Sequence, residues 1–294
     1  MIGERDKDTV KKISSDNFLK EIFKNIFLPD ICSSCGDINK GLLCEKCRQE
    51  IPEISGIICR NCGTPVFIKN TKDCAVSYNL ISTSVNSMIF HTKNDQSSFV
   101  LKTPGRKDTR TLCINCRNSE YSFYRLRSFG FYSGILKKLI IKYKYNKIYS
   151  LAPVLCSFLK KIYDNCFRNE KIDFVETVPD FTLNANDFKK SFYPEKNHMQ
   201  ILAELFSREV RLPYLNNMIK IRKTLKQHNL GMHERKINLK DTFKARNILK
   251  VTQRNILILD DVWTTGNTLN EISRVLKKCG ADKIYLLTLA RAIW

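Results

Sequence analysis

The sequence predicts an α/β protein with a largely parallel sheet, preceded by a small cysteine-rich module. Three observations predict this fold class. From residue 121 onward, helical and strand-like patterns alternate along the chain. Within that region, an apolar strand at 255–259 leads through two acids into a glycine-containing turn and a helix. Ahead of residue 121, four Cys-x-x-Cys pairs recur with the spacing of zinc knuckles.

The alternation after residue 121 has the segment lengths of βαβ units, whose strands pair in parallel through right-handed crossovers. We expect helices at 134–144, 151–166, 197–210, 228–237 and 268–279. We expect strands at 172–178, 255–259 and 283–289.

Three segments divide the 294 residues. Residues 1–28 have the pattern of a short amphipathic helix that Pro29 stops. Residues 29–120 form the cysteine module, in which 63–112 is rich in Ser, Thr and Asn and is typical of an insertion or loop. Residues 121–294 have the length of one large α/β domain.

The composition is that of a chain with a packed core and no membrane span. Hydrophobic residues make up 43% of it, and no stretch approaches the ~18 unbroken apolar residues that a span needs. The charged N-terminus lacks the apolar segment of a secretory signal. We therefore expect a cytoplasmic protein, in which 12 cysteines serve as metal ligands or free thiols more often than as disulfides.

Positive charge is concentrated in the second part of the chain. The formal net charge is +21, and residues 121–294 hold 32 basic against 15 acidic residues. Residues 121–150 contain seven basic residues and no acid. A field of one sign on this scale favours phosphate-bearing partners, such as nucleotides or nucleic acid. The alternative is a general lysine bias that only decorates the surface, but the first 120 residues are nearly balanced.

The segment 256–268, ILILDDVWTTGNT, has the pattern of a phosphate-binding strand, loop and helix. Backbone N–H groups at a helix N-terminus hold phosphate, and Gly266 permits the tight turn and close approach that this requires. Threonine hydroxyls in the loop add donors. The adjacent carboxylates of Asp260 and Asp261 suit the hydroxyls of a ribose, or a hydroxyl pair bound to Mg²⁺. The alternative, a capped βα turn, explains one acid and one threonine but not the whole ordered run.

The chain as a whole resembles the ComF family, in which a cysteine zinc module precedes a type I phosphoribosyltransferase-like domain. The match includes YSGILKKLIIKYKY at 132–145, RKTLKQHNLGMHERKINLKDTF at 222–243 and the closing LLTLARAIW. The resemblance implies a parallel sheet of that domain type and binding of phosphoribosyl pyrophosphate (PRPP) with Mg²⁺. It places the ribose hydroxyls on Asp260 and Asp261, which would be the catalytic pair.

The resemblance also assigns the remaining sugar-phosphate contacts. The phosphate-binding and PRPP-binding residues would be Val262, Thr264, Thr265, Gly266, Asn267, Thr268, Lys196, Arg222, Gln227 and Arg235. The sequence departs from the family near the pyrophosphate, where an R-G-F-N-Q element is usual and this chain has Lys196-Asn197-His198-Met199-Gln200. Asp180 adds an acid at the same strand end. Sugar-phosphate binding is therefore a firmer expectation than turnover.

The four Cys-x-x-Cys pairs predict one or two structural zinc ions, because two such knuckles supply the four thiolates of one tetrahedral site. The ligands would be Cys32, Cys35, Cys44, Cys47, Cys59, Cys62, Cys113 and Cys116. The first two pairs are near enough in sequence to form one site, which leaves the last two to close a second across the insertion. A cross-braced pairing of first with third and second with fourth stays open, and catalytic dithiols are a further alternative. Zinc would supply much of the module's folding free energy.

Residues 121–150 interleave cations with aromatic residues, a pattern that can track a single nucleic-acid strand. The candidate nucleic-acid contacts are Lys137, Lys138, Lys142 and Lys144. In the alternative, the aromatics belong to the core and the lysines to a solvated face, because Ile135, Leu139 and Tyr143 repeat at helical spacing.

Two principal functions follow from these features. The first is an accessory factor of DNA uptake that binds PRPP or a related ribose phosphate and engages single-stranded DNA, and works with the DNA-uptake machinery. The second is an active phosphoribosyltransferase acting on an unidentified base or amine. A metal-dependent binding module with a vestigial pocket is a third possibility.

Overall fold

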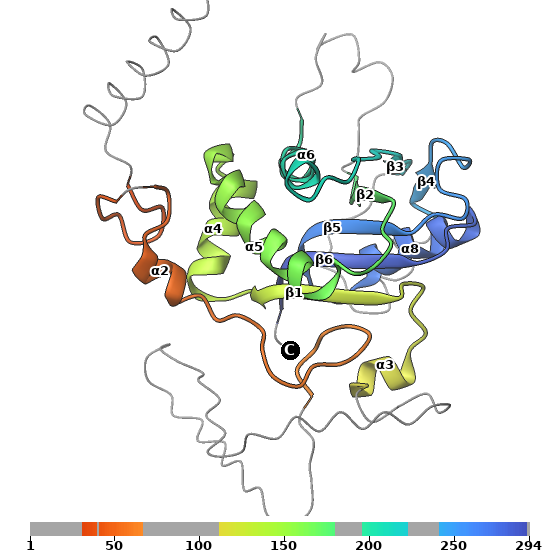
Figure 1. Ribbon diagram of the computed structural model, residues 1–294, viewed down its shortest axis with the longest axis horizontal. Coiled ribbons are helices and arrows are strands. Elements are labelled where there is room, and N and C mark those ends of the chain that lie inside the picture. The colour runs from red at the N-terminus through yellow and green to blue at the C-terminus, as the bar shows by residue number, and fades with distance from the viewer. Residues whose placement is uncertain (1–30, 40, 67–111, 180–195, 223–240, 293–294) are drawn as a thin grey trace, which may run out of the picture. The chain divides into compact units, whose positions relative to one another are not determined.

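The computed structural model describes residues 31–39, 41–66, 112–179, 196–222 and 241–292 (Figure 1). The chain divides into two compact units, Met1–Glu50 and Ile51–Trp294. In the first unit, a short helix α2 (Glu45–Gln49) follows a turn closed by a bridge between Ile31 and Ile38. The predicted domain limits at 29–120 and 121–294 stay a prediction, and the predicted helix at 1–28 lies outside the described residues.

The second unit is built on a four-stranded sheet in the order β1-β6-β5-β2. All neighbouring strands pair in parallel. The strands are β1 (Arg125–Phe131), β2 (Phe174–Thr177), β5 (Ile256–Trp263) and β6 (Ile284–Arg291). Every residue of β6 is buried, as expected for a central strand covered on both faces. The predicted α/β fold class with a parallel sheet is therefore confirmed.

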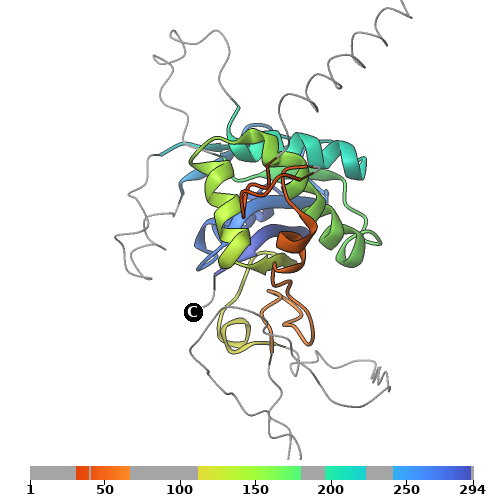
Figure 2. The ribbon, with the colours of Figure 1, turned by 90° about the vertical axis from the view of Figure 1, so that its left-hand side faces the viewer.

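Helices cover both faces of this sheet. On one face α5 (Ala152–Cys166) packs against β1 and β6, and α6 (His198–Val210) packs against β2 and β5. The stacked rings of Phe129 and Phe158, with centroids 4.4 Å apart, join β1 to α5. On the opposite face, α8 (Asn267–Lys278) packs against β6. Figure 2 shows α5 and α6 together on one side of the sheet.

The remaining elements connect or cover this frame. They are α3 (Ile114–Asn118), α4 (Gly134–Lys144), the 3₁₀ turn η2 (Tyr149–Leu151) and a hairpin of β3 (Met218–Lys220) with β4 (Phe243–Ala245). Residues 52–54 lie along the free edge of β1, where the N–H of Ile54 donates to the carbonyl of Phe129 over 3.0 Å. That contact blunts an edge strand that would otherwise be open to pairing.

Four of the five predicted helices are confirmed, at 134–144, 151–166, 197–210 and 268–279, and the one at 228–237 lies outside the described residues. The three predicted strands are present as well. The prediction that the strand at 255–259 ends at Leu259 is wrong. β5 continues through both acids to Trp263, because β6 extends alongside it and pairs Trp263 with Arg291.

The sequence pattern missed β1 and the hairpin. β1 carries Arg125 and Arg127, which made its residues look like part of a basic surface. The guanidinium of Arg125 pairs with Glu170 at 2.9 Å, and that of Arg127 donates to the carbonyls of Arg60 and Leu126. Satisfied partners of this kind let a strand carry arginines at the sheet edge. Among the described residues, no helix is long and apolar enough to cross a membrane.

Candidate ribose-phosphate site and cysteine clusters

The predicted phosphate loop connects β5 to α8 at the carboxyl end of the sheet, where open α/β sheets bind ligands. Gly266 is the N-cap of α8 with φ of 77°, a left-handed conformation that L side chains rarely adopt. Its carbonyl accepts the N–H of Asn270 at 2.8 Å and so begins the helix. Thr264 is exposed and Thr265 half-buried, which leaves the loop open to solvent.

Close packing on Trp263 explains why this position is a glycine. A Cβ built on Gly266 would lie 2.0 Å from the Trp263 indole. The indole is buried and makes edge-to-face contacts with Phe123, at 5.7 Å between centroids, and with Tyr121, at 6.1 Å. The sequence predicted that Gly266 permits a tight turn and a close approach of the backbone to phosphate. The structure has the tight turn. The close contact that the structure describes is between Gly266 and the Trp263 ring.

Asp260 and Asp261 end up in different surroundings, although they are neighbours in sequence. Asp260 is half-buried and accepts the backbone N–H of Asp261 at 2.9 Å. Asp261 is buried at 6% exposure. Its Oδ2 accepts the Lys144 ammonium at 2.5 Å and lies 3.3 Å from Nε2 of His198. Three segments that are distant in sequence therefore meet at one carboxylate oxygen.

Electrostatics hold this carboxylate ionised. Burial by itself would raise the pKa of Asp261, but the hydrogen bond from His198 and the charge of Lys144 outweigh it and lower the pKa to about 2. The same partner raises the pKa of Lys144 against its own burial. Asp261 is therefore charged throughout the physiological range, and an ionised carboxylate is an acceptor only.

Of the other predicted sugar-phosphate residues, the structure describes Val262, Lys196 and Arg222. Val262 is half-buried in β5 opposite Ala290. Lys196 forms an exposed ion pair with Glu204 at 2.7 Å. Arg222 lies 3.5 Å from the hydroxyl of Thr242. Gln227 and Arg235 lie outside the described residues. The assignment of these five residues stays a prediction.

The short stretch that resembles the family's pyrophosphate element has a clear structural role at its ends. Asn197 caps α6 by accepting the N–H of Gln200 at 2.8 Å, and the Gln200 side chain accepts the N–H of Asn197 at 3.0 Å. Together they form a capping box that fixes the start of α6. The residue between them that reaches the carboxylate, His198, was quoted in the sequence pattern but given no role. The sequence feature that could have indicated a role for His198 was its place in the first turn of a predicted helix after a predicted strand.

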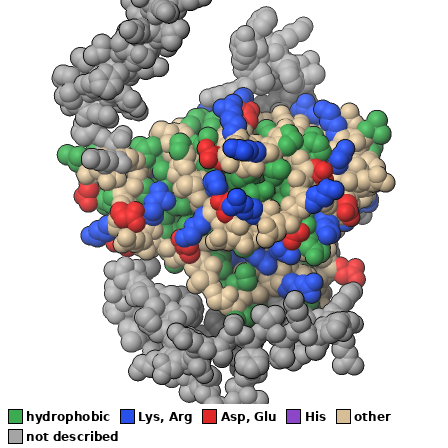
Figure 3. Space-filling view, viewed as in Figure 1, with side chains coloured by type: hydrophobic (Ala, Val, Ile, Leu, Met, Phe, Trp, Pro, Cys, Tyr) green, Lys and Arg blue, Asp and Glu red, His purple; other side chains and the backbone are tan. Residues whose placement is uncertain are grey.

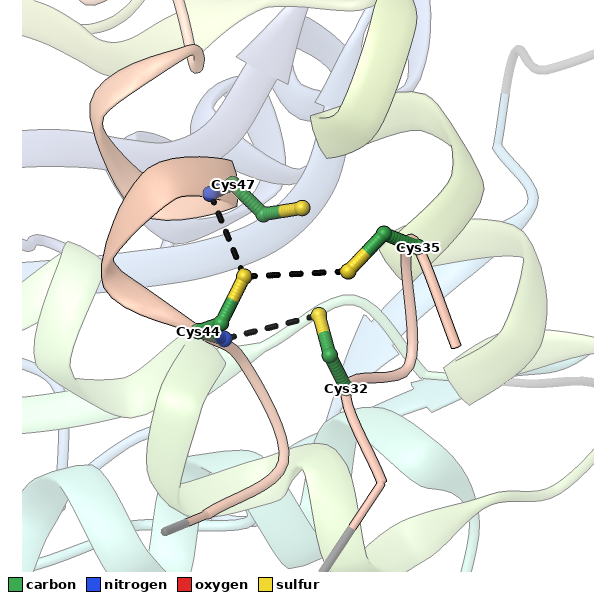
Figure 4. Close-up of side chains that lie close together, drawn as sticks. All are labelled: Cys32, Cys35, Cys44 and Cys47. Carbon is green, nitrogen blue, oxygen red and sulfur yellow. Dashed lines mark hydrogen bonds between the residues drawn. The ribbon is translucent and has the colours of Figure 1, made fainter. Parts of the chain in front are cut away.

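The first cysteine cluster lies in the first unit and contains Cys32, Cys35, Cys44 and Cys47. Figure 4 shows the four side chains converging, two from the turn after Ile31 and two from the start of α2. The sulfurs of Cys35 and Cys44 are 3.7 Å apart. Zn–S bonds of about 2.3 Å in a tetrahedron place sulfurs about 3.8 Å apart, so the spacing fits zinc, and a disulfide at about 2.0 Å is excluded.

The second cluster lies in the second unit and contains Cys59, Cys62, Cys113 and Cys116. The sulfurs of Cys62 and Cys113, which flank the long insertion, are 3.5 Å apart. The structure thus brings third and fourth pairs together, and the cross-braced alternative is wrong. The sulfurs in each cluster lie within 4.8 Å of one another, and all eight cysteines are free thiols.

The two clusters are copies of one local design. Each joins a knuckle followed by a glycine at positive φ, Gly36 or Gly63, to a pair at the start of a five-residue helix. Within the first cluster the surroundings favour the thiolate of Cys32, whereas burial raises the pKa of Cys47. For Cys32, burial opposes ionisation, but N–H groups of Cys44, Cys35 and Ser34 lower its pKa to about 6. Thiolate is the form that binds zinc.

The predicted nucleic-acid lysines separate into two groups. Lys137 and Lys138 are exposed and Lys142 half-buried on α4, whereas Lys144 points to Asp261. Of the aromatic residues in this stretch, Phe123, Phe129 and Tyr143 are buried in the core. Tyr124 and Tyr145 are exposed at 41% and 64%. On the face drawn in Figure 3, basic side chains are spread among acidic ones and form no single continuous patch.

Comparison with known proteins gives matches to both parts of the chain. Residues 23–77 match the double zinc ribbon domain, and residues 198–293 match the phosphoribosyl transferase domain. The fourth cysteine pair, Cys113 and Cys116, lies outside the match to the double zinc ribbon domain. In the structure it nevertheless clusters with the third pair, Cys59 and Cys62. A crystal structure of adenine phosphoribosyltransferase aligns with a TM-score of 0.32 at 14% identity, covering 49% of this chain and 73% of that one.

The alignments with two curated relatives cover most of the length of each relative. Competence protein F of Haemophilus influenzae is 30% identical over 183 residues, which cover 61% of this chain and 78% of the relative. The DNA utilization protein YhgH of Escherichia coli strain K12 is 26% identical over 183 residues, which cover 62% and 78%. With its cysteine clusters in support of structural zinc, its parallel sheet and these relatives, the chain belongs to the competence protein F (ComF) family.

Proposed function

We propose that this chain binds the ribose-phosphate part of PRPP, or of a closely related sugar phosphate, as an accessory factor in DNA uptake. The observation that carries the proposal is the juxtaposition at the end of β5. An ionised, buried Asp261 and its neighbour Asp260 directly precede an open loop that ends at the N-terminus of α8. The part in DNA uptake rests on the relatives named for competence and DNA utilization.

The chemistry of the loop suits a phosphate. The first turn of α8, Asn267–Asn270, contains no acid, so that the positive end of the helix dipole is not neutralised. The side-chain nitrogen of Asn267 is buried and, within the described residues, has no hydrogen-bond partner. Buried hydrogen-bond donors normally have an acceptor, and a phosphate oxygen would be an acceptor for this one. With PRPP, Asp260 and Asp261 would help to hold a Mg²⁺ ion, which prefers oxygen ligands and would neutralise charge on the phosphates.

A double amide variant tests the ribose half. Replacing Asp260 and Asp261 by asparagine keeps the shape but removes both charged acceptors, so PRPP should no longer raise the melting temperature. For the unaltered chain, PRPP at one hundred times its Kd should stabilise by about 2.7 kcal/mol. Thermal shift with and without PRPP measures this. Asp164→Asn on α5 is the matched control, since its carboxylate pairs with Lys160 on the helix surface. An equal shift in the double variant would contradict the ribose assignment.

The exposed face of α4 supports a second activity, binding of single-stranded DNA. Lys137 and Lys138 are adjacent and exposed there, and the Lys137 ammonium lies 5.7 Å from the centre of the Tyr132 ring. The exposed Tyr145 follows the same helix. Cations beside accessible rings can neutralise phosphates and stack bases.

Salt dependence tests this second activity. Each lysine that contacts phosphate on a single strand adds about 0.7 to the slope of log affinity against log salt, so Lys137→Ala with Lys138→Ala should lower that slope by about 1.4. The matched control is Lys277→Ala with Lys278→Ala, a pair of exposed lysines at the end of α8. Binding of a labelled oligonucleotide at several salt concentrations gives the slopes. A slope that falls equally in both variants would place the DNA elsewhere.

An active phosphoribosyltransferase is the other candidate, favoured by the domain match over 198–293. The ion pair of Lys196 and the capping box of Asn197 and Gln200 already engage side chains expected near pyrophosphate. These contacts favour binding over turnover. Release of pyrophosphate from PRPP, screened across bases and amines, decides between the two.

A further inference from the structure

A cavity lies at the C-terminal end of α6, away from the phosphate loop. Its volume of about 360 Å³ is in the range of small-molecule sites in proteins. It is lined by residues 211–214 and, from α6, by Glu204, Ser207 and Arg208. The other end of α6 begins with His198 beside Asp261, and at 1.5 Å per residue Ser207 lies about 14 Å further along the helix axis. The cavity is therefore separate from the site proposed for the sugar phosphate.

Ser207 brings a buried hydroxyl to this cavity, and the described part of the chain offers that hydroxyl no hydrogen-bond partner. The residue is 6% exposed. Serines inside helices commonly donate to a carbonyl about one turn back, as Ser157 on α5 and Ser273 on α8 do, each at 2.7 Å. Because buried polar groups are paired in the great majority of cases, the exception at Ser207 indicates a partner that a ligand in the cavity supplies.

The charges that line the cavity favour an anion. Arg208 and Arg211 are both exposed at the end of α6, and within the described residues neither guanidinium has an ion-pair partner. The one acid of the lining, Glu204, accepts the Lys196 ammonium at 2.7 Å. The helix dipole also favours cations at a C-terminus, which is the alternative explanation for the two arginines. It does not account for the unpartnered hydroxyl of Ser207 beside them.

The segment after α6 gives the cavity a fixed wall with an aromatic ring. The hydroxyl of Tyr214, which is half-buried, lies 2.8 Å from the hydroxyl of Thr177 at the end of β2. The carbonyl of Pro213 accepts the N–H of Val175 on the same strand at 2.9 Å. A ring that the sheet already holds loses little freedom when a ligand packs on it. Together with Leu212 it suits a flat aromatic group.

We propose that this cavity binds a small aromatic phosphomonoester, with the chemistry of a nucleoside 5′-monophosphate. Arg208 and Arg211 pair with the phosphate oxygens, since planar guanidinium donors match phosphate well. The Ser207 hydroxyl donates to one of the same oxygens. The aromatic body lies against Tyr214 and Leu212. The site goes beyond the proposed function, because it holds a second ligand at the opposite end of α6 from the phosphate loop.

Calorimetry on the full zinc-loaded chain, with AMP as the probe, tests this site. AMP should bind about tenfold or more tightly than adenosine, which lacks the phosphate. Arg208→Gln with Arg211→Asn should weaken AMP binding about ten- to hundredfold, because it removes two charged donors. Asparagine tolerates the left-handed φ of 58° at position 211. The matched control, Lys277→Gln with Lys278→Gln, removes the same charge from the end of α8 and should leave the AMP affinity unchanged.

Ser207→Ala separates a hydroxyl that serves a ligand from one that serves the fold. Without ligand, deleting a buried hydroxyl that has no partner should raise the melting temperature by about 2 to 4 °C. The same variant should weaken AMP binding about three- to tenfold. A lower melting temperature, or an unchanged AMP affinity, would overturn the part given to Ser207 and with it the site.

Three further results would overturn the proposal. They are no binding of AMP at millimolar concentration, equal affinities for AMP and adenosine, and an AMP affinity that the arginine variant leaves unchanged. The last result would place AMP at another site, such as the phosphate loop. None of them bears on whether PRPP binds at that loop, so the cavity and the proposed function stand or fall separately.

Discussion

Gly266→Ala is expected to abolish sugar-phosphate binding and to lower the free energy of unfolding by about 2 to 5 kcal/mol. Two effects add at this position. The left-handed φ of 77° strains any residue with a Cβ, and that Cβ would lie 2.0 Å from the buried Trp263 ring. The ring cannot move freely, because Phe123 and Tyr121 contact its edges. The loop therefore has to shift, which misplaces the N–H groups proposed to hold phosphate. Chemical denaturation and PRPP thermal shift measure the two losses.

Gly280→Ala is the matched control for this substitution. Gly280 also has a positive φ, of 83°, but its nearest neighbour is the Thr252 methyl at 3.3 Å. It ends α8 far along the helix from the loop, so it shares the backbone strain without the clash. We expect it to cost about 1 kcal/mol and to keep PRPP binding. If both variants bind PRPP equally well, the loop does not hold the phosphate.

The phosphate loop shows how much of a site one segment can predict. The order of strand, acids, threonines, glycine and helix is local, and the structure has the helix within one residue of its predicted start. Trp263 looked like one more loop residue in the sequence. Its role as the floor of the Gly266 turn depends on Phe123 and Tyr121, about 140 residues earlier, and no local pattern encodes that packing.

Lys144 shows the opposite limit. Its surroundings in sequence, a run of lysines and tyrosines without an acid, indicated a nucleic-acid surface. Helical spacing correctly predicted that Leu139 and Tyr143 face the core. It could not predict that the last turn of α4 ends beside the carboxyl end of β5. Lys144 and Asp261 are 117 residues apart, and the path of the chain between them brings their charges together. A single sequence does not specify that path.

The cysteines were predictable as ligands, and their spacing favoured the pairing that the structure has, although it did not exclude the cross-braced one. Spacing identifies a Cys-x-x-Cys knuckle, because the bite of the turn is local. The site that contains Cys62 and Cys113 is closed across a long insertion. Which knuckles pair there depends on how the sheet positions them. Leu126 of β1 donates its N–H to the carbonyl of Asn61 at 2.7 Å, which fixes the third knuckle against the strand.

Loss of zinc from the second cluster is expected to unfold the core of the second unit, whereas loss from the first is not. Cys59, Cys62 and Cys116 are members of the same buried cluster as Phe123 and Trp263. None of the first cluster's cysteines is among the described members of that core. Structural zinc contributes about 10 to 16 kcal/mol of binding free energy in small zinc domains, so losing one ion exceeds the stability of a typical domain.

The second cluster is also tied to the central strand. The Arg291 guanidinium, buried at the end of β6, donates to the carbonyl of Cys62 at 2.7 Å and to the hydroxyl of Thr64 at 2.6 Å. That hydroxyl lies 3.0 Å from the sulfur of Cys62. Arg291 pairs in register with Trp263 on β5. We therefore expect movement of the Cys62 knuckle to shift the strand ends that precede the phosphate loop.

A pair of serine variants separates the two clusters. Each of Cys116→Ser and Cys35→Ser should lower the bound zinc from two ions to one, measured by a colorimetric chelator after proteolysis. Only Cys116→Ser should lower the melting temperature of the sheet by more than about 10 °C and remove the PRPP shift. In a Trp294→Phe background Trp263 is the sole tryptophan, so its emission should move to longer wavelength in that variant alone. If Cys116→Ser keeps both its PRPP shift and its Trp263 emission, the phosphate loop does not depend on the second zinc, and the contacts through Arg291 and Trp263 have no consequence for binding.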